Sequence, residues 1–216
     1  MVIRCPAAAA LAVSALLLAA CSAGSSAGQP LISGTQQKGV LDCAPAPNPA
    51  PSAGTPAWNS PTGFAYDWYF NASALPVEIE SVSLIGNHNL VLHGAVVYRG
   101  PHDIITSDGW PVMGRNANPS AWAQRQNVPG AVIPPQPSTN GAPDPDEPEY
   151  AVIIDVSAKT PAGGYAIGQQ VTYKQGNSHY TIRTYTGYAI VPLGRNGPDC
   201  DAADKAINAA WKNTPG

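Results

Sequence analysis

His102 and Asp103 are the adjacent side chains of this chain that could carry acid–base chemistry. A histidine beside a carboxylate can serve as a general base with its orienting partner. A nucleophile in a recognisable setting is missing, because the chain has no G-x-S-x-G motif around a serine. We therefore expect a solvated loop histidine and no catalytic residues, and keep an extracytoplasmic hydrolase using His102 and Asp103 as an alternative.

The sequence offers few ligands for a metal. His88 and His93 are five residues apart, which places them on opposite faces of an extended strand. Carboxylates gather in DPDEPE (residues 144–149), but prolines stiffen this stretch and the EF-hand spacing is absent. Met113 has no cluster of His or Cys beside it that would suit copper. We expect no metal and no cofactor, and interpret the acidic stretch as a solvated loop.

The N-terminus has the pattern of a secretory signal. Residues 1–20 combine Arg4 with an apolar run that is too short for a comfortable membrane span. The run ends in Leu18-Ala19-Ala20-Cys21, which resembles the bacterial lipobox. The resemblance implies cleavage before Cys21 and a diacylglyceryl group on its thiol, which would hold the protein at the outer face of the cytoplasmic membrane. The alternative is an ordinary secreted protein in which Cys21 merely lies near the cleavage site.

The cysteine count predicts one disulfide. Of the four cysteines, Cys5 leaves with the signal peptide and Cys21 takes the lipid, so Cys43 and Cys200 remain. Outside the cytoplasm, two remaining cysteines most simply form a disulfide. Metal binding or redox work by these thiols is the alternative, but a C-x-x-C spacing and a nearby histidine are absent. The predicted bond joins the start of the domain to its C-terminal tail.

Composition favours a loop-rich β protein. Charged residues make up 12% of the chain, which contains 23 prolines and 21 glycines. The formal net charge is −3 and no basic patch is present, so nucleic acid is not expected as a partner. Residues 21–60 are rich in Ser, Gly and Pro and are predicted to form a flexible tether. One domain is expected over residues 61–216.

Alternating apolar residues predict antiparallel strands in this domain. Residues 77–85 and 90–100 are expected to pair as a hairpin through the turn Gly86–Asn89. A second hairpin pairs AIGQQVTYK with SHYTIRTYTGYAIVPL and shows the clearest period of two. The stretch 199–213 predicts a short C-terminal helix, with acidic residues at its start. Asn71-Ala72-Ser73 matches a glycosylation sequon, which we interpret as a turn.

Short strands without βαβ alternation predict an all-β fold. A single sheet of this size would leave an apolar face in water, so we expect an antiparallel β-sandwich. The strand rhythm over residues 62–193 resembles immunoglobulin-like domains of bacterial surface lipoproteins, an actinobacterial-type group of uncharacterised family. The resemblance implies an immunoglobulin-like fold and a membrane anchor, and implies no activity. A long Pro/Gly-rich excursion interrupts the predicted sandwich.

That excursion, residues 101–149, is where we expect binding. Trp110, Met113, Trp122 and Arg125 lie in it, and side chains of these kinds dominate interface energetics. The expected partner is an envelope protein or the cell wall, bound by a non-enzymatic protein. Both tryptophans folding back to cap the core is the alternative for these residues. A structural accessory subunit of a membrane complex is the alternative for the function.

Overall fold

Runs of β-branched and aromatic residues with a period of two form the strands of this protein. Over the described residues the chain is mainly β-sheet, followed by helix α3 (Pro198–Lys212), so the all-β prediction and the C-terminal helix are confirmed. Of the described helices, none is long and apolar enough to span a bilayer. The computed structural model describes residues 28–34, 41–45, 59, 61–100, 123–139, 142–143, 149–192 and 198–214.

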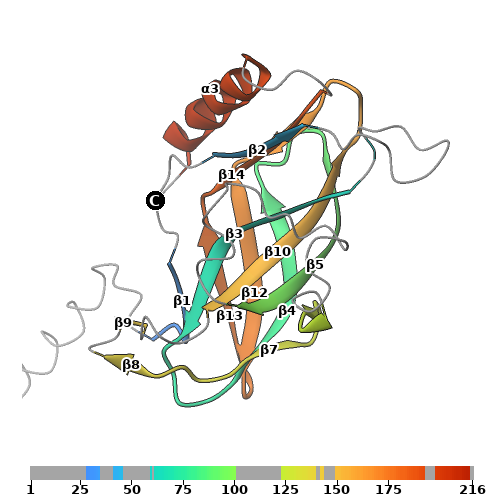
Figure 1. The fold of residues 1–216 in the computed structure, drawn as a ribbon. Helices are drawn as coiled ribbons and strands as arrows, with labels where there is room; N and C mark the ends of the chain where they lie inside the picture. Colours follow the sequence, from blue (N-terminus) through green and yellow to red (C-terminus); the bar gives the residue numbers. More distant parts are fainter. Residues whose placement is uncertain are drawn as a thin grey trace, which may run out of the picture.

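The strands are arranged in three larger sheets and one small ribbon (Figure 1). Sheet A has the order β1-β3-β10-β5-β6, sheet B the order β11-β14-β2, and sheet C the order β13-β12-β4-β7; β8 pairs with β9. The bounds are β1 (Leu31–Ser33), β2 (Leu41–Pro45), β3 (Thr62–Asn71), β4 (Val77–Ile85), β5 (Leu90–Gly100), β6 (Gln126–Asn127), β7 (Ala131–Ile133), β8 (Ser138–Thr139), β9 (Ala142–Pro143), β10 (Glu149–Ala158), β11 (Gly164–Ala166), β12 (Gly168–Gln175), β13 (Ser178–Thr184) and β14 (Gly187–Val191).

Sheet A forms one layer, and sheets B and C together form the other. Tyr69 of sheet A shares a buried cluster with Ile79 and Tyr173 of sheet C. Phe64 of sheet A packs on Tyr188 of sheet B, with ring centroids 5.6 Å apart. Burying such side chains between two layers is the main source of stability for a fold of this kind, at about 1.5–3 kcal/mol for each large apolar side chain.

A β-bulge in β4 explains an irregular apolar pattern in the sequence. Val171 of β12 lies opposite Val82, whereas Tyr173 lies opposite Ile79, so Glu80 has no partner in the register. The extra residue changes the phase of the alternation. Ile79 before the bulge and Val82 after it consequently pack into the same core.

The predicted hairpin of residues 77–85 with residues 90–100 is wrong. Strand β4 belongs to sheet C, and β5 belongs to sheet A, where it pairs with β10 along its whole length. The turn at Gly86–Asn89 therefore carries the chain from one layer to the other. The second predicted hairpin, β12 with β13, is confirmed, with Val171 opposite Ile182 and Tyr173 opposite Tyr180.

Two strands lie inside the segment predicted as a tether. Strand β1 pairs with β3, and β2 pairs with β14, so the domain boundary at residue 60 is wrong for these segments. The pairing of β2 with β14 is parallel, which corrects the expectation that all pairs are antiparallel. Distant strands supply the hydrogen bonds that hold these short segments, so local sequence gives little sign of them.

The predicted disulfide between Cys43 and Cys200 is confirmed. Cys43 lies in β2 and Cys200 in α3, with Cα atoms 6.0 Å apart and a sequence separation of 157. The other end of α3 is fixed by Trp211, whose Nε1–H donates to the carbonyl of Ile167 at 2.8 Å. Ile207 of the same helix is fully buried beside them. Helix α3 is thus attached to the sheets at both ends.

Candidate functional site

A groove of about 450 Å³ lies between α3 and the end of the sandwich on which it packs. The position of α3 over β2 and β14 is visible at the top of Figure 1. The groove is formed by four separate segments of the chain, so no single sequence motif predicts it. The residues lining it are His88, Asn89, Ala162, Gly163, Gly164, Tyr165, Ile190, Val191, Pro192, Asp199, Ala202, Ala203 and Ala206.

One wall of the groove is an aromatic pair. The His88 ring stacks on the Tyr165 ring, with centroids 5.0 Å apart and an interplanar angle of 15°. The backbones of the same two residues exchange hydrogen bonds, His88 N–H to Tyr165 O at 2.7 Å and Tyr165 N–H to His88 O at 2.8 Å. Both the rings and the main chain are therefore held in place, which gives a flat and preorganised surface.

The turn that carries His88 is fixed by its neighbour Asn89. Asn89 has a φ of 65°, a left-handed conformation that Asn tolerates better than most residues. Its side-chain amide donates to Thr160 Oγ1 at 2.8 Å and to the carbonyl of Gly163. A Cβ on Gly163 would lie 2.3 Å from the carbonyl oxygen of Ile190, so only glycine lets the two segments come this close. The groove floor is thus built by tight backbone contact.

The opposite wall is the face of α3 that carries small side chains. Ala202, Ala203 and Ala206 line the groove, and a helix face of alanines leaves room for a ligand. Cys200 lies one turn earlier in α3 and joins the helix to β2. The disulfide therefore fixes the distance between this wall and the sheet.

Asp199 places a carboxylate at the end of the groove. It lies in the first turn of α3, where the helix dipole favours negative charge. Its Oδ2 atom is buried and has no hydrogen-bond partner among the described residues. A buried acceptor without a partner costs free energy, which a ligand with an N–H or O–H donor would recover.

The groove lining combines apolar side chains with a few polar groups. The residues lining it include a histidine, a tyrosine and an aspartate, but no serine, threonine or cysteine that could act as a nucleophile. Among the described residues, no group of three or more His, Cys, Asp and Glu is placed to hold a metal ion. An apolar lining with a few polar groups is typical of sites that bind small molecules or peptide segments.

Inside the sandwich, a buried carboxylate ties the two layers together. Asp67 of β3 is fully buried and accepts hydrogen bonds from Thr184 Oγ1 at 2.5 Å, from Thr186 Oγ1 at 2.8 Å and from the Tyr188 hydroxyl. Burial and the nearby Asp67 hold the pKa of Tyr188 well above its ordinary value, so this phenol stays protonated and donates. Tyr188 is in β14, whose Ile190 lines the groove, so the network positions the floor.

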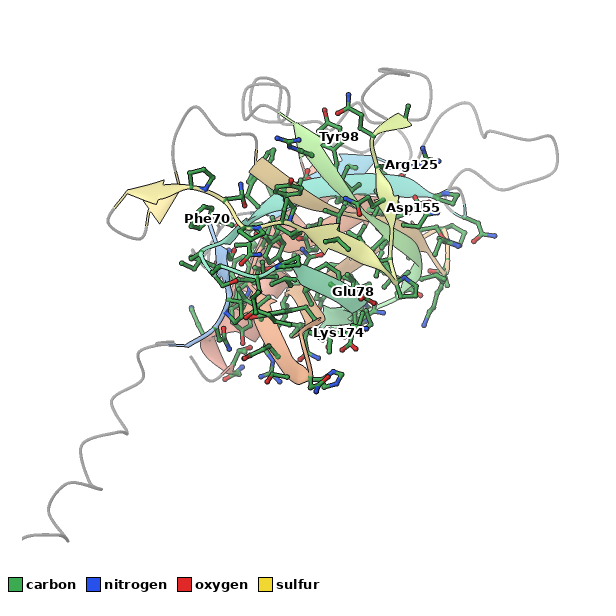
Figure 2. All side chains as sticks on the ribbon, turned by 90° about the horizontal axis from the view of Figure 1, so that it is seen from below. Phe70, Glu78, Tyr98, Arg125, Asp155 and Lys174 are labelled. Atoms are coloured by element: carbon green, nitrogen blue, oxygen red, sulfur yellow. A yellow bond between two sulfur atoms is a disulfide. The ribbon has the colours of Figure 1, made fainter. Side chains whose placement is uncertain are left out.

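Most of the predicted binding residues lie outside the described part of the chain. This holds for Trp110, Met113 and Trp122, and equally for Cys21 and for His102 with Asp103. Arg125 is described: it is half-buried, precedes β6 and lies beside β5 near Tyr98 (Figure 2). Arg125 is not among the residues that line the groove.

A Ser–His contact does occur, at a place the sequence did not indicate. His93 Nε2 lies 2.7 Å from Ser157 Oγ, across β5 and β10. Ser157 is fully buried, so its hydroxyl is not accessible to a substrate carbonyl. His88 and His93 have different partners: the first stacks on Tyr165 and the second contacts Ser157.

Sequence reasoning missed the groove residues His88 and Asp199. The sequence places His88 in a predicted turn and Asp199 at the start of a predicted helix. Only the fold brings these two segments together at the groove. No family model matches the chain, and comparison with curated proteins finds no match.

Proposed function

We propose that this protein is a lipid-anchored, non-catalytic binding protein at the outer face of the cytoplasmic membrane. The observation that carries the proposal is the bond between Cys43 and Cys200. A structural disulfide fits an oxidising, extracytoplasmic compartment. With Cys5 inside the signal sequence, Cys21 of the LAAC box is left as the cysteine for the lipid. In this proposal the two-layered β body is an immunoglobulin-like sandwich, as in the surface lipoproteins that the sequence resembles.

The groove beside α3 is the binding site in this proposal. Its apolar lining suits an apolar body, and the Asp199 carboxylate, whose Oδ2 has no partner among the described residues, suits a hydrogen-bond donor on the ligand. A peptide segment of an envelope protein or of the cell wall offers both features. The excursion over residues 101–149, with Trp110 and Trp122, is proposed as a second contact for the same partner.

Filling the groove tests the binding site. Ala202 is exposed and lines the groove, so Ala202→Trp should block it without disturbing the core. Ala209→Trp is the matched control, because Ala209 is exposed on the same helix and does not line the groove. Crosslinking in living cells, followed by identification of the captured partner, should give the same partner for wild type and for Ala209→Trp, and lose it for Ala202→Trp. Equal capture by all three proteins would rule out the groove.

Two further measurements separate the remaining parts of the proposal. Trp110→Ala with Trp122→Ala should weaken the same capture if the excursion contributes. The intact mass of the protein extracted from membranes should correspond to a chain that begins at an acylated Cys21. A soluble mature chain with an unmodified Cys21 thiol would disprove the anchor.

A further inference from the structure

The chain enters the sandwich at the end opposite α3. Leu31, the first residue of β1, lies opposite Asn71, the last residue of β3. Gln29, just before it, donates from Nε2 to the carbonyl of Thr181 in β13 at 3.2 Å. The turn between β3 and β4 (residues 72–76) and the turn between β12 and β13 lie at this same end, which Figure 2 views directly. Helix α3, which lines the groove, lies at the other end (Figure 1).

A lipid on Cys21 would keep the entry end close to the bilayer. Nine residues separate Cys21 from Leu31 in the sequence. Fully extended, this segment spans at most about 35 Å. The ten-residue strand β3 has a similar length, about 33 Å, so the tether is about as long as the sandwich itself. The end that carries Leu31 is therefore the end nearest to the anchor.

An exposed leucine is presented at this end. Leu75, in the turn between β3 and β4, is 58% exposed, and Ile32 of β1 is 36% exposed. Single exposed apolar residues are common and need no function by themselves. At Leu75, side-chain hydrogen bonds also hold the backbone carbonyl.

Two side-chain amides fix the Leu75 carbonyl: Asn71 Nδ2 and Gln175 Nε2 each donate to this oxygen at 2.9 Å. The Ser73 hydroxyl donates to Asn71 Oδ1 at 2.6 Å and holds the other side of the turn. Asn71 is fully buried and also donates to the carbonyl of Ile133 at 3.0 Å, so the turn is attached to the core. Burial of Asn71 leaves no room for a glycan at this sequon, and the predicted turn is confirmed. A turn fixed in this way exposes the Leu75 side chain to solvent from a rigid backbone. Contact of this side chain with a surface would therefore cost little backbone conformational entropy.

The charges beside the turn do not oppose contact with a membrane. Lys174 and Glu78, which Figure 2 labels at this end, form an ion pair at 3.0 Å and largely neutralise each other. Because the proposed covalent anchor would already hold the domain near the surface, contact of the Leu75 side chain with lipid would favour this orientation over others.

We propose that the Leu75 turn rests on the lipid surface, so that the sandwich stands on this end and the groove faces away from the membrane. This inference relies on the proposed lipid anchor. It places the groove about one strand length, roughly 30 Å, above the lipid, where an envelope partner can reach it.

Site-specific fluorescence tests this orientation in the lipidated protein. With Cys21 acylated and Cys43 bonded to Cys200, an introduced cysteine is the free thiol of the mature chain. We would label Ala74→Cys, beside Leu75, and Ala209→Cys on α3, with an environment-sensitive dye; both residues are exposed. In phosphatidylglycerol–phosphatidylethanolamine vesicles that contain brominated lipid, the dye at position 74 should shift to the blue and lose intensity. The dye at position 209 should do neither.

The leucine itself is tested by adding Leu75→Ser to the Ala74→Cys protein, which should abolish the shift and the quenching. Equal signals at positions 74 and 209, or quenching that survives Leu75→Ser, would overturn the proposal. Protection of position 74 in native membranes but not in lipid vesicles would assign the turn to a protein partner instead. The intact mass is measured on the same sample, so a missing acyl group identifies failure of the anchor, whereas an acylated protein without quenching identifies failure of the orientation.

Discussion

Asp42 should make the stability of this protein depend on pH, and removing its charge should stabilise the fold above neutral pH. Asp42 lies in β2 opposite Tyr188 of β14, and its carboxylate has no hydrogen bond or ion pair with the described residues. Burial raises the pKa of its carboxyl from 3.8 to about 7. The cause is desolvation, which penalises the charged form.

The direction and size of the effect follow from this shift. Between about pH 4 and pH 7 the folded state holds a proton on Asp42 that the unfolded state has lost, so the free energy of unfolding falls as pH rises through this interval. Each pKa unit corresponds to 1.36 kcal/mol, so the loss above pH 7 reaches at most about 4 kcal/mol. Asp42→Asn carries no charge in either state and should lose this pH dependence.

Urea unfolding of the oxidised protein at pH 4 and pH 8.5 measures the effect. With a slope of about 2 kcal/mol per molar urea, the midpoint of Asp42→Asn should exceed that of wild type by up to about 2 M at pH 8.5. The two midpoints should nearly coincide at pH 4. Asp201→Asn, at an exposed position in α3, is the control and should keep the wild-type pH dependence. Parallel pH profiles for wild type and Asp42→Asn would refute the reasoning.

Three other substitutions should lower the free energy of unfolding, each by an amount estimated from the contact it removes. Replacing Cys43 and Cys200 together by alanine should cost up to about 5 kcal/mol of unfolding free energy, because the closed loop is long; an unchanged urea midpoint would contradict this. Asp67→Ala leaves three buried hydroxyl donors without their acceptor and should cost about 3 kcal/mol or more, seen as a lower thermal midpoint than for Asp67→Asn. Trp211→Phe removes the bond to the Ile167 carbonyl and should cost about 1 kcal/mol in thermal unfolding followed by circular dichroism, with no loss as the contrary result.

Elements held by local signals could be predicted from the sequence. The hairpin of β12 with β13 has a two-residue period and a tight turn, so its register needs no information from the rest of the chain. Helix α3 has acidic residues in its first turn and apolar residues, among them Ile207 and Trp211, spaced four apart. Both were predicted correctly for these reasons.

Elements held by distant partners could not be predicted. The turn Gly86–Asn89 looks the same whether the strands on either side pair with each other or enter different layers. In the structure β10, distant in the sequence, pairs with β5, and β12 pairs with β4. Strands β1 and β2 could not be predicted for the same reason, because their hydrogen-bond partners lie in β3 and β14.

The groove shows this limit most clearly. His88, Tyr165 and Asp199 come from three segments that no spacing rule connects. The buried Asp67 likewise sits in an aromatic run, and only Thr184, Thr186 and Tyr188 from the far end of the domain satisfy it.

The sequence by itself determined the class of fold, the pairing of Cys43 with Cys200 and the C-terminal helix, because each depends on residue types that act locally or on a simple count of cysteines. The tertiary structure alone decided which strands became neighbours, where the chain enters the sandwich and which side chains line the groove. The physical reason is that side-chain periodicity specifies which face of a strand is buried, but not which of several similar apolar faces will cover it.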